Sequence, residues 1–156
     1  MATKTGTNGS NILRGTSDSD VLIGRGGDDI LYGRSDADVL RGDGGDDRLF
    51  GQGGDDTMIG GRGDDLMFGG TADNTFVFAR NSGEDVIGDY RKGDENLIDV
   101  SAYGIKRFDD LDIDESASGI TIDLGKSAGG SGNVNTVTLL GLNDDDLDAG
   151  DFIFVA

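Results

Sequence analysis

The sequence predicts an all-β protein in which a parallel β-roll is completed by an antiparallel C-terminal cap. Three observations support this fold class. A nine-residue period runs from Gly6 to Val77 without an insertion, every period ends in residues that favour strands, and the second half alternates apolar with polar residues. We therefore expect repeats in residues 1–77 and, in residues 78–156, a cap that continues the roll.

The repeat region consists of eight nonapeptides, which read GTNGSNILR, GTSDSDVLI, GRGGDDILY, GRSDADVLR, GDGGDDRLF, GQGGDDTMI, GGRGDDLMF and GGTADNTFV. The first six residues of a unit favour a turn and the last three favour a strand. A coil that closes on itself needs two strands and two turns, so two units form one coil. Residues eighteen positions apart therefore stack, about 4.8 Å from each other as in a parallel sheet.

Position six of the units, counted from Gly6, is Asp in six units and Asn in the first and the last. Stacking places these residues in two columns, one with Asn11, Asp29, Asp47 and Asp65 and the other with Asp20, Asp38, Asp56 and Asn74. A calcium ion with Ca–O distances of about 2.3 to 2.6 Å fits between two stacked carboxylates. With three gaps in each column, we expect at most six ions, held less firmly at the ends because Asn is neutral.

The composition favours a cation as partner. A net charge of −18, from 13 Lys and Arg against 31 Asp and Glu, argues against nucleic acid and against an anionic membrane surface. Cys and His are absent, which excludes disulfides and thiolate metal sites but not Ca²⁺, because Ca²⁺ requires only oxygen ligands. Composition alone would also suit a disordered chain, and the regular placement of the carboxylates argues against that alternative.

These units resemble the GGxGxDxUx repeats of RTX proteins, the calcium β-roll of secreted proteases, lipases, toxins and alginate epimerases. GTSDSDVLI and GRSDADVLR lack the Gly at position four, and GGTADNTFV lacks both that Gly and the Asp. The resemblance implies ligation by the Asp at position six and by the carbonyl groups of positions two and four, here those of Arg25, Gly27, Asp43, Gly45, Gln52, Gly54, Gly61 and Gly63. The alternative is that Gly and Asp shape the loops without metal.

The second half carries NTFVFA, DVIGDY, NLIDVSAYG and DLDAGDFIF, which resemble the serralysin-type C-terminal domain that follows RTX repeats. Four carboxylates near the junction either hold a further ion or are solvated turn residues, and we favour the second explanation for Asp85, Asp89, Asp94 and Asp99. We expect a capped helical turn in residues 143–148. The tail from Asp151 to Val155 resembles that of type I secretion substrates and equally suits a final core strand.

Position nine of alternate units holds Arg14, Tyr32, Phe50 and Phe68, which predicts an exposed aromatic ladder. With six Arg against one Lys in the repeat half, including the nearby Arg48, this ladder could bind an anionic polysaccharide. Alternatively it stabilises neighbouring strands and lies under the cap or a parent domain, and we favour this explanation.

We expect a module without catalytic function, because His and Cys are absent and no feature selects a carboxylate pair suited to glycoside hydrolysis. The resemblance implies the C-terminal module of a secreted, extracellular bacterial protein that folds on Ca²⁺, is exported by type I secretion machinery and supports a covalently attached passenger. The alternative is an alginate-binding module of a mannuronan epimerase or a similar enzyme. The first eleven residues are polar and no stretch reaches transmembrane length, so we expect neither a signal peptide nor membrane insertion.

Overall fold

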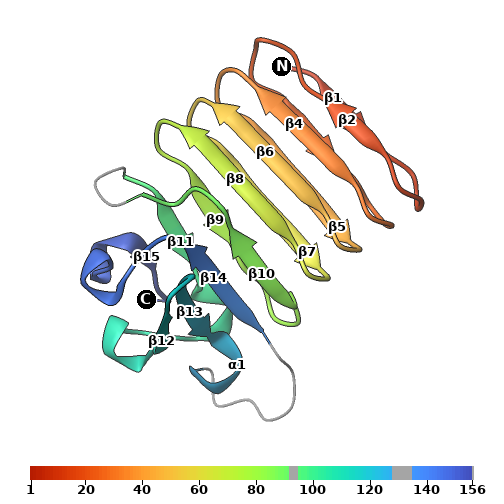
Figure 1. Ribbon diagram of the computed structural model, residues 1–156. Helices are drawn as coiled ribbons and strands as arrows, with labels where there is room; N and C mark the ends of the chain where they lie inside the picture. The colour runs from red at the N-terminus through yellow and green to blue at the C-terminus, as the bar shows by residue number, and fades with distance from the viewer. Residues whose placement is uncertain (92–94, 128–134, 156) are drawn as a thin grey trace.

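Two sheets form the coil in the computed structural model, which describes residues 1–91, 95–127 and 135–155 (Figure 1). Within these residues, the first sheet contains, in spatial order, β1 (Thr3–Thr5), β3 (Val21–Ile23), β5 (Val39–Gly44), β7 (Thr57–Arg62), β9 (Thr75–Val77), β11 (Leu97–Asp99) and β15 (Phe152–Ile153). The second sheet contains β2 (Ile12–Arg14), β4 (Ile30–Arg34), β6 (Arg48–Gly53), β8 (Leu66–Thr71), β10 (Glu84–Ile87), β14 (Thr136–Leu140), β13 (Gly119–Asp123) and β12 (Asp112–Ser116).

The nine-residue register of the repeats is confirmed. Equivalent residues of units two apart are paired in parallel, so that Leu31 lies opposite Leu13 on one side and Leu49 on the other. Position eight points into the coil, and its side chains are fully buried from Leu22 to Met67. Since one side chain from each unit faces its counterpart across the coil, the interior of the roll is a narrow row of Leu and Met.

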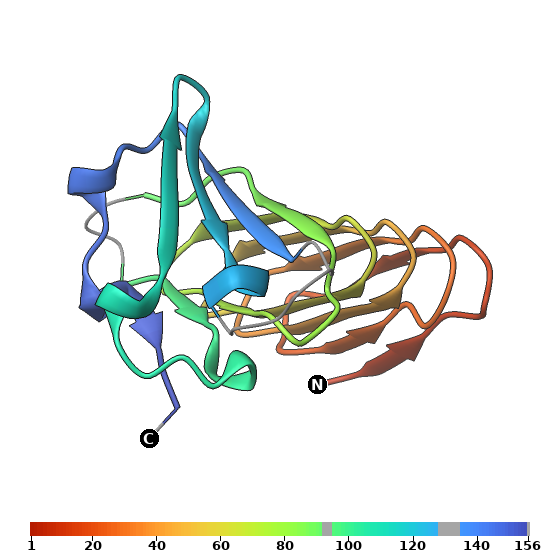
Figure 2. The same cartoon turned by 90° about the horizontal axis from the view of Figure 1, so that it is seen from below.

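The parallel roll continues beyond the repeats. β10 pairs with β8 at an offset of twenty residues, Val86 opposite Leu66, and β11 pairs with β9 at an offset of twenty-two, Ile98 opposite Phe76. β14 and β15 then add a further parallel strand to each sheet. Among the described strands, antiparallel pairing is confined to β12 with β13 and β13 with β14, and the β12–β13 hairpin stands out from the C-terminal end of the roll (Figure 2). The expected antiparallel cap is therefore confined to this end.

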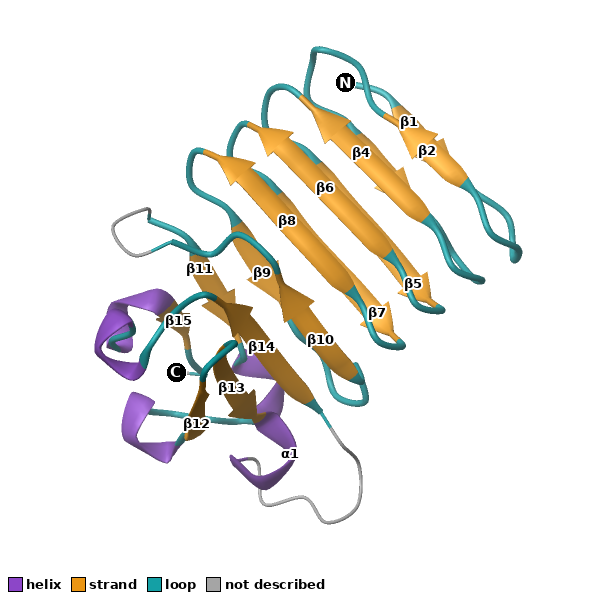
Figure 3. Cartoon of the chain, in the orientation of Figure 1, coloured by secondary structure: helices purple, strands orange, loops and turns teal. Residues whose placement is uncertain are grey.

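The described helical segments all lie in the second half (Figure 3) and are η1 (Ser101–Tyr103), η2 (Phe108–Asp110), α1 (Leu124–Ser127), η3 (Asp144–Asp146) and η4 (Ala149–Asp151). η3 confirms the helical turn expected in residues 143–148. Phe152 in β15 is buried, so β15 is a core strand of the first sheet. Among the described residues, no helix combines the length and the apolar character needed to cross a bilayer.

Candidate metal centre

The position-six carboxylates form two buried columns, as expected. In the interior of the columns each carboxylate is about 1% exposed and uses its Oδ1 atom as an acceptor for a backbone N–H of the preceding coil. Asp29 donates its N–H to Asp47 at 2.7 Å, and Asp47 donates its own to Asp65 at 2.8 Å. These hydrogen bonds fix every carboxylate group in the same orientation along the stack.

The second oxygen of these carboxylates has no protein partner. Five buried Oδ2 atoms within the described residues accept no hydrogen bond, and they belong to Asp29, Asp38, Asp47, Asp56 and Asp65. A buried carboxylate oxygen without a donor is unfavourable unless a cation or a proton compensates it. We call these five atoms the unpartnered oxygens.

Gly at position one leaves room for each unpartnered oxygen. A Cβ atom on Gly42 would collide with Oδ2 of Asp47 and would lie 2.6 Å from the carbonyl oxygen of Gly60 in the next coil. The carboxylate oxygen and this carbonyl oxygen thus approach the same point between two stacked turns. No three carboxylates converge on one point in the described part of the chain. The atoms that meet between the turns are single carboxylate oxygens and backbone carbonyl oxygens, both of which are ligand types of Ca²⁺.

The backbone of these turns is left-handed at positions two and four. Positive φ angles occur at all eight residues whose carbonyl groups the resemblance implies, which are Arg25, Gly27, Asp43, Gly45, Gln52, Gly54, Gly61 and Gly63. Arg34 and Asp36 of the fourth unit adopt the same geometry, with φ angles of 96° and 61°. They were missed because this unit lacks Gly at position four, although Asp tolerates left-handed backbone better than most residues.

Asn74 occupies the same position as the column carboxylates, but its amide group has hydrogen-bond partners for both of its polar atoms. Its Oδ1 accepts the N–H of Asp56 at 3.1 Å, while its Nδ2 donates to the position-four carbonyl of Ala72 at 3.1 Å. Nδ2 also lies 2.7 Å from the place of a Cβ on Gly69, where the Asp units have their Oδ2. In the Asp units, the acceptor Oδ2 stands where Asn74 has the donor Nδ2. Oδ2 and the position-four carbonyl oxygen are then two neighbouring acceptors, and a cation between them would satisfy both.

The amide groups of the two Asn residues are oriented differently. In Asn11, Oδ1 takes the place that Oδ2 has in the Asp units, beside Gly6, and accepts the N–H of Thr7 at 2.6 Å, while Nδ2 donates to the carbonyl of Gly9. Both amide groups direct an N–H group, and not an oxygen, toward the position-four carbonyl of their own turn.

Burial also raises the pKa values of the column carboxyls. It raises the pKa of Asp47 to about 6, that of Asp56 to about 7 and that of Asp65 to about 8, and neighbouring carboxylates of the stack add to the effect. Asp20 is the exception, because a hydrogen bond from the N–H of Ala2 lowers its pKa and Thr16 contributes in the same direction. Ionised carboxylates that are buried and stacked in this way are unfavourable unless a positive charge compensates them.

The junction residues separate into different roles. Asp85 is 1% exposed and accepts the N–H of Asp65 at 3.0 Å, so it extends the column and is not the solvated turn residue that we favoured. Asp89 accepts two consecutive N–H groups, those of Gly69 at 2.9 Å and Gly70 at 2.8 Å, and fixes the last repeat turn. Asp99 accepts the N–H of Ser101. Asp94 lies outside the described residues.

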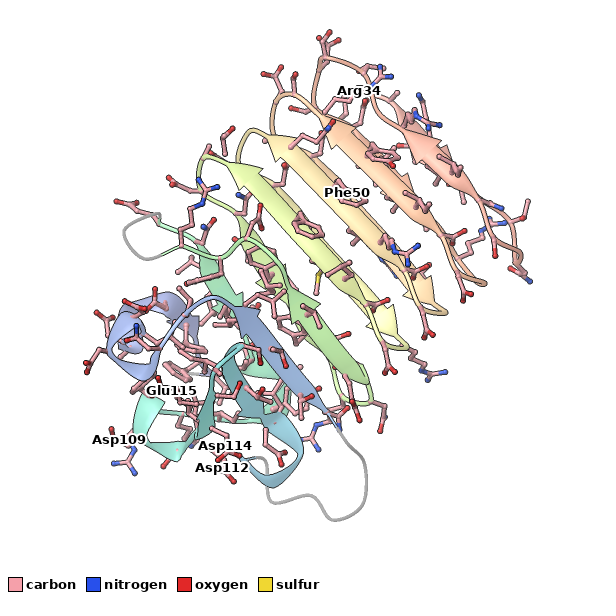
Figure 4. All side chains as sticks on the ribbon, in the orientation of Figure 1. Arg34, Phe50, Asp109, Asp112, Asp114 and Glu115 are labelled. Carbon is pink, nitrogen blue, oxygen red and sulfur yellow. The ribbon has the colours of Figure 1, made fainter. Side chains whose placement is uncertain are left out.

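The aromatic ladder is present on the outer face of the second sheet (Figure 4). Tyr32 stacks on Phe50 at 5.1 Å and Phe50 on Phe68 at 5.3 Å, with interplanar angles of 12° and 5°. The guanidinium carbon of Arg14 lies 5.2 Å from the centre of the Tyr32 ring, and the Phe68 ring occupies the space beside Gly88. Ring faces are therefore used within the ladder, as expected if it stabilises neighbouring strands.

Comparisons with known proteins agree with this geometry. No curated protein sequence matches the chain. Among solved structures, the AlgE6R2 subunit from the Azotobacter vinelandii mannuronan C5-epimerase aligns at a TM-score of 0.64 and 24% identity, covering 97% of this chain and 92% of the subunit. The AlgE6R3 subunit of the same epimerase aligns at 0.58 and 24%, covering 96% and 80%. This chain is similar to both in fold.

The family of RTX calcium-binding nonapeptide repeats (4 copies) matches residues 5–40 and again residues 41–76. Each match spans four nonapeptides, so the two together account for the eight units, the buried columns and the left-handed turns. Residues 5–76 of this chain therefore carry RTX calcium-binding nonapeptide repeats.

Proposed function

We propose that this chain is a noncatalytic module of a secreted protein whose folding depends on calcium. The observation that carries the proposal is the set of five unpartnered oxygens, each buried beside backbone carbonyl groups in a repeat of the calcium-binding type. In this proposal the side-chain ligands are Asp29, Asp38, Asp47, Asp56 and Asp65. The carbonyl ligands are those of positions two and four, including Arg34 and Asp36.

Calcium supplies the positive charge that the stacked oxygens lack. The residues themselves determine where this charge is needed, because the Oδ1 hydrogen bonds orient each carboxylate and Gly at position one keeps the space open. Without the ion, buried carboxylates repel one another, and one Leu or Met in nine residues buries too little surface to offset the loss of chain entropy. The repeats therefore fold when calcium is available.

This dependence suits a protein that crosses a membrane unfolded and folds outside the cell, where calcium is more abundant. We propose that a type I secretion machinery exports the chain, that residues 78–156 close the C-terminal end of the roll, and that the folded module stabilises a covalently attached passenger. The tail from Asp151 to Val155 serves as the export signal while unfolded and forms β15 afterwards.

Far-UV circular dichroism tests the calcium dependence. We expect a largely disordered spectrum in EGTA, full β signal in millimolar Ca²⁺, and little recovery in Mg²⁺, which demands a smaller octahedral site and gives up its water reluctantly. Full β signal at nanomolar free calcium would sink the proposal.

Binding of an anionic polysaccharide such as alginate is the second candidate, and one specific observation favours it. β2, β4, β6 and β8 contain no Asp or Glu, although the chain carries a charge of −18, and the exposed Arg14, Arg34 and Arg48 belong to these strands. Figure 4 shows Arg34 and Phe50 on this side of the roll, far from Asp112, Asp114 and Glu115 near the opposite end. The similarity to epimerase subunits supports the same candidate.

The test is retention on immobilised alginate in calcium, compared with a neutral polysaccharide. The double variant Arg34→Ala and Arg48→Ala should lose retention with an unchanged circular dichroism spectrum. Arg41→Ala is the matched control, because Arg41 lies on the other sheet and forms an ion pair with Asp43. If the double variant and the control bind alginate equally well, this face does not bind the polymer.

A further inference from the structure

Both carboxylate columns end in turns that are closed by the protein's own donors. We propose that these four end turns take the place of ion sites, so that the chain binds five Ca²⁺ ions, three in the column of Asp29, Asp47 and Asp65 and two in the column of Asp38 and Asp56. The inference rests on the proposed calcium function and goes beyond it, because it assigns the ions to particular turns and names the residues that end each row.

Thr16 closes the N-terminal end of the column that contains Asp38 and Asp56, which we call the shorter column; the column of Asp29, Asp47 and Asp65 is the longer one. The backbone N–H of Thr16 donates to Oδ2 of Asp20 at 2.6 Å, and its hydroxyl group lies 2.9 Å from the same oxygen and 3.3 Å from the carbonyl oxygen of Asp18. The hydroxyl thus stands between the carboxylate and the position-four carbonyl, the place that a cation takes in the proposed sites. The oxygen that is unpartnered in Asp38, one coil further on, is satisfied in Asp20.

Asn74 closes the other end of the shorter column, since its amide N–H binds the position-four carbonyl of Ala72. In the longer column, Asn11 does the same at the first end by donating to Gly9. At the last end, the hydroxyl of the buried Ser82, which lies 3.2 Å from the hydroxyl of Tyr103, lowers the pKa of Asp85 against the rise that burial causes. The five unpartnered oxygens are those between these four closures.

Backbone geometry sets the two N-terminal closures apart from the other turns. Every unit from the third to the eighth has positive φ at positions two and four, whereas Thr7, Gly9, Thr16 and Asp18 of the first two units do not. The first two units therefore form a turn of another kind, in which position two donates to the carboxylate or amide of position six. An ion at the N-terminal end of a stack would have a complete repeat turn on one side only, and a built-in donor removes the need for it. The eighth unit, by contrast, has the backbone of the proposed ion sites, and only the amide of Asn74 closes it.

Counting bound calcium tests the inference. Wild-type protein should bind five ions by equilibrium dialysis or native mass spectrometry. Thr16→Gly removes the hydroxyl and allows the left-handed backbone of the other units, so Oδ2 of Asp20 becomes available and the count should rise to six. Thr7→Gly is the matched control. It makes the same change in the first unit, but the amide of Asn11 still closes that turn, and the count should stay at five.

Asp56→Asn tests the same idea in the other direction. Its amide should bind the carbonyl of Gly54 as Asn74 binds that of Ala72, so the variant should bind four ions and keep its β signal in saturating calcium. A wild-type protein that binds no calcium would contradict the proposed function itself. Calcium binding with the same count in wild type and Thr16→Gly, or an Asp56→Asn variant that still binds five, would overturn only the inference. If Thr16→Gly does not fold, the count for Asp56→Asn decides alone.

Discussion

Asp46 and Asp47 are adjacent and chemically identical, yet their surroundings differ in every respect that matters for calcium. Asp47 is buried, its Oδ1 accepts the N–H of Asp29, and its Oδ2 has no partner. Asp46 is exposed, and its carboxylate accepts the N–H of Asp64 at 3.0 Å on the surface of the next coil. The side chain at position six thus faces the column, whereas that at position five lies along the outside of the turn.

Replacing the two residues separately should therefore give unequal effects. Asp47→Ala removes an ion ligand and leaves the buried N–H of Asp29 without an acceptor, which costs about 1 to 3 kcal/mol in addition to roughly 2.7 kcal/mol for a site held at a hundred times its Kd. Asp46→Ala should cost less than about 1 kcal/mol. Calcium titrations followed by far-UV circular dichroism measure the difference, and equal midpoints would show that the register of ligands is wrong.

At the scale of the elements, the sequence predicts the repeats far better than the second half. A fixed period of nine places each strand and each inward Leu or Met, because stacking repeats the same local pattern. β10 and β11 join the roll at offsets of twenty and twenty-two residues. β14 pairs with β10 although the two are about fifty residues apart in the sequence, with Thr138 opposite Val86. Such pairings depend on loop lengths and long-range packing, which alternation of apolar residues does not encode.

The sequence also does not predict the donors that close the ends of the carboxylate columns. Thr16 occupies a position that holds Arg, Asp, Gln or Gly in the following units, and this variety gives no sign that Thr has a separate role there. The donation of its N–H and hydroxyl to Asp20 depends on a backbone conformation that only the structure reveals. The burial of Asp85 has the same origin, because the irregular offset of β10 conceals that it continues a column.

The aromatic ladder links strands of neighbouring coils, so truncating its centre should weaken the second sheet. Phe50→Ala removes two stacked contacts, each worth about 0.5 to 1.5 kcal/mol beyond the buried area. We expect a loss of about 2 to 3 kcal/mol in urea unfolding at saturating calcium. Ile59→Ala is the control, since Ile59 is half-buried at the same position on β7 without a ring partner. Equal losses in the two variants would contradict a role for stacking.

For the whole molecule, electrostatics opposes folding until ions bind. The chain has a formal charge of −18, and five Ca²⁺ ions would reduce it to −8 while also connecting stacked coils. Each coil contacts mainly the coils beside it, as in other solenoids, so stability accumulates along the stack. The metal-free protein therefore lacks both charge compensation and the links between its turns, and protons are the other species able to neutralise the column carboxylates.

Protonation should accordingly stabilise the metal-free roll. The pKa values of Asp47, Asp56 and Asp65 in the folded chain are raised from 3.8 to about 6, 7 and 8 because these groups are buried. A raised carboxyl pKa contributes stability that is fully present below the unfolded value and is lost as the pH rises through the folded value. In calcium-free buffer, the β signal should thus increase when the pH falls from 8 to 5.

Calcium affinity should change in the opposite direction and fall as the pH falls. Ca²⁺ requires ionised carboxylates and must displace protons below about pH 8. Calcium binding at pH 6.5 should release protons, detectable as a dependence of the calorimetric enthalpy on the ionisation enthalpy of the buffer. Asp65→Asn cannot titrate and should flatten the upper part of the calcium-free pH profile. A metal-free protein that loses β signal between pH 8 and 5 would show that the column carboxylates are not buried as described.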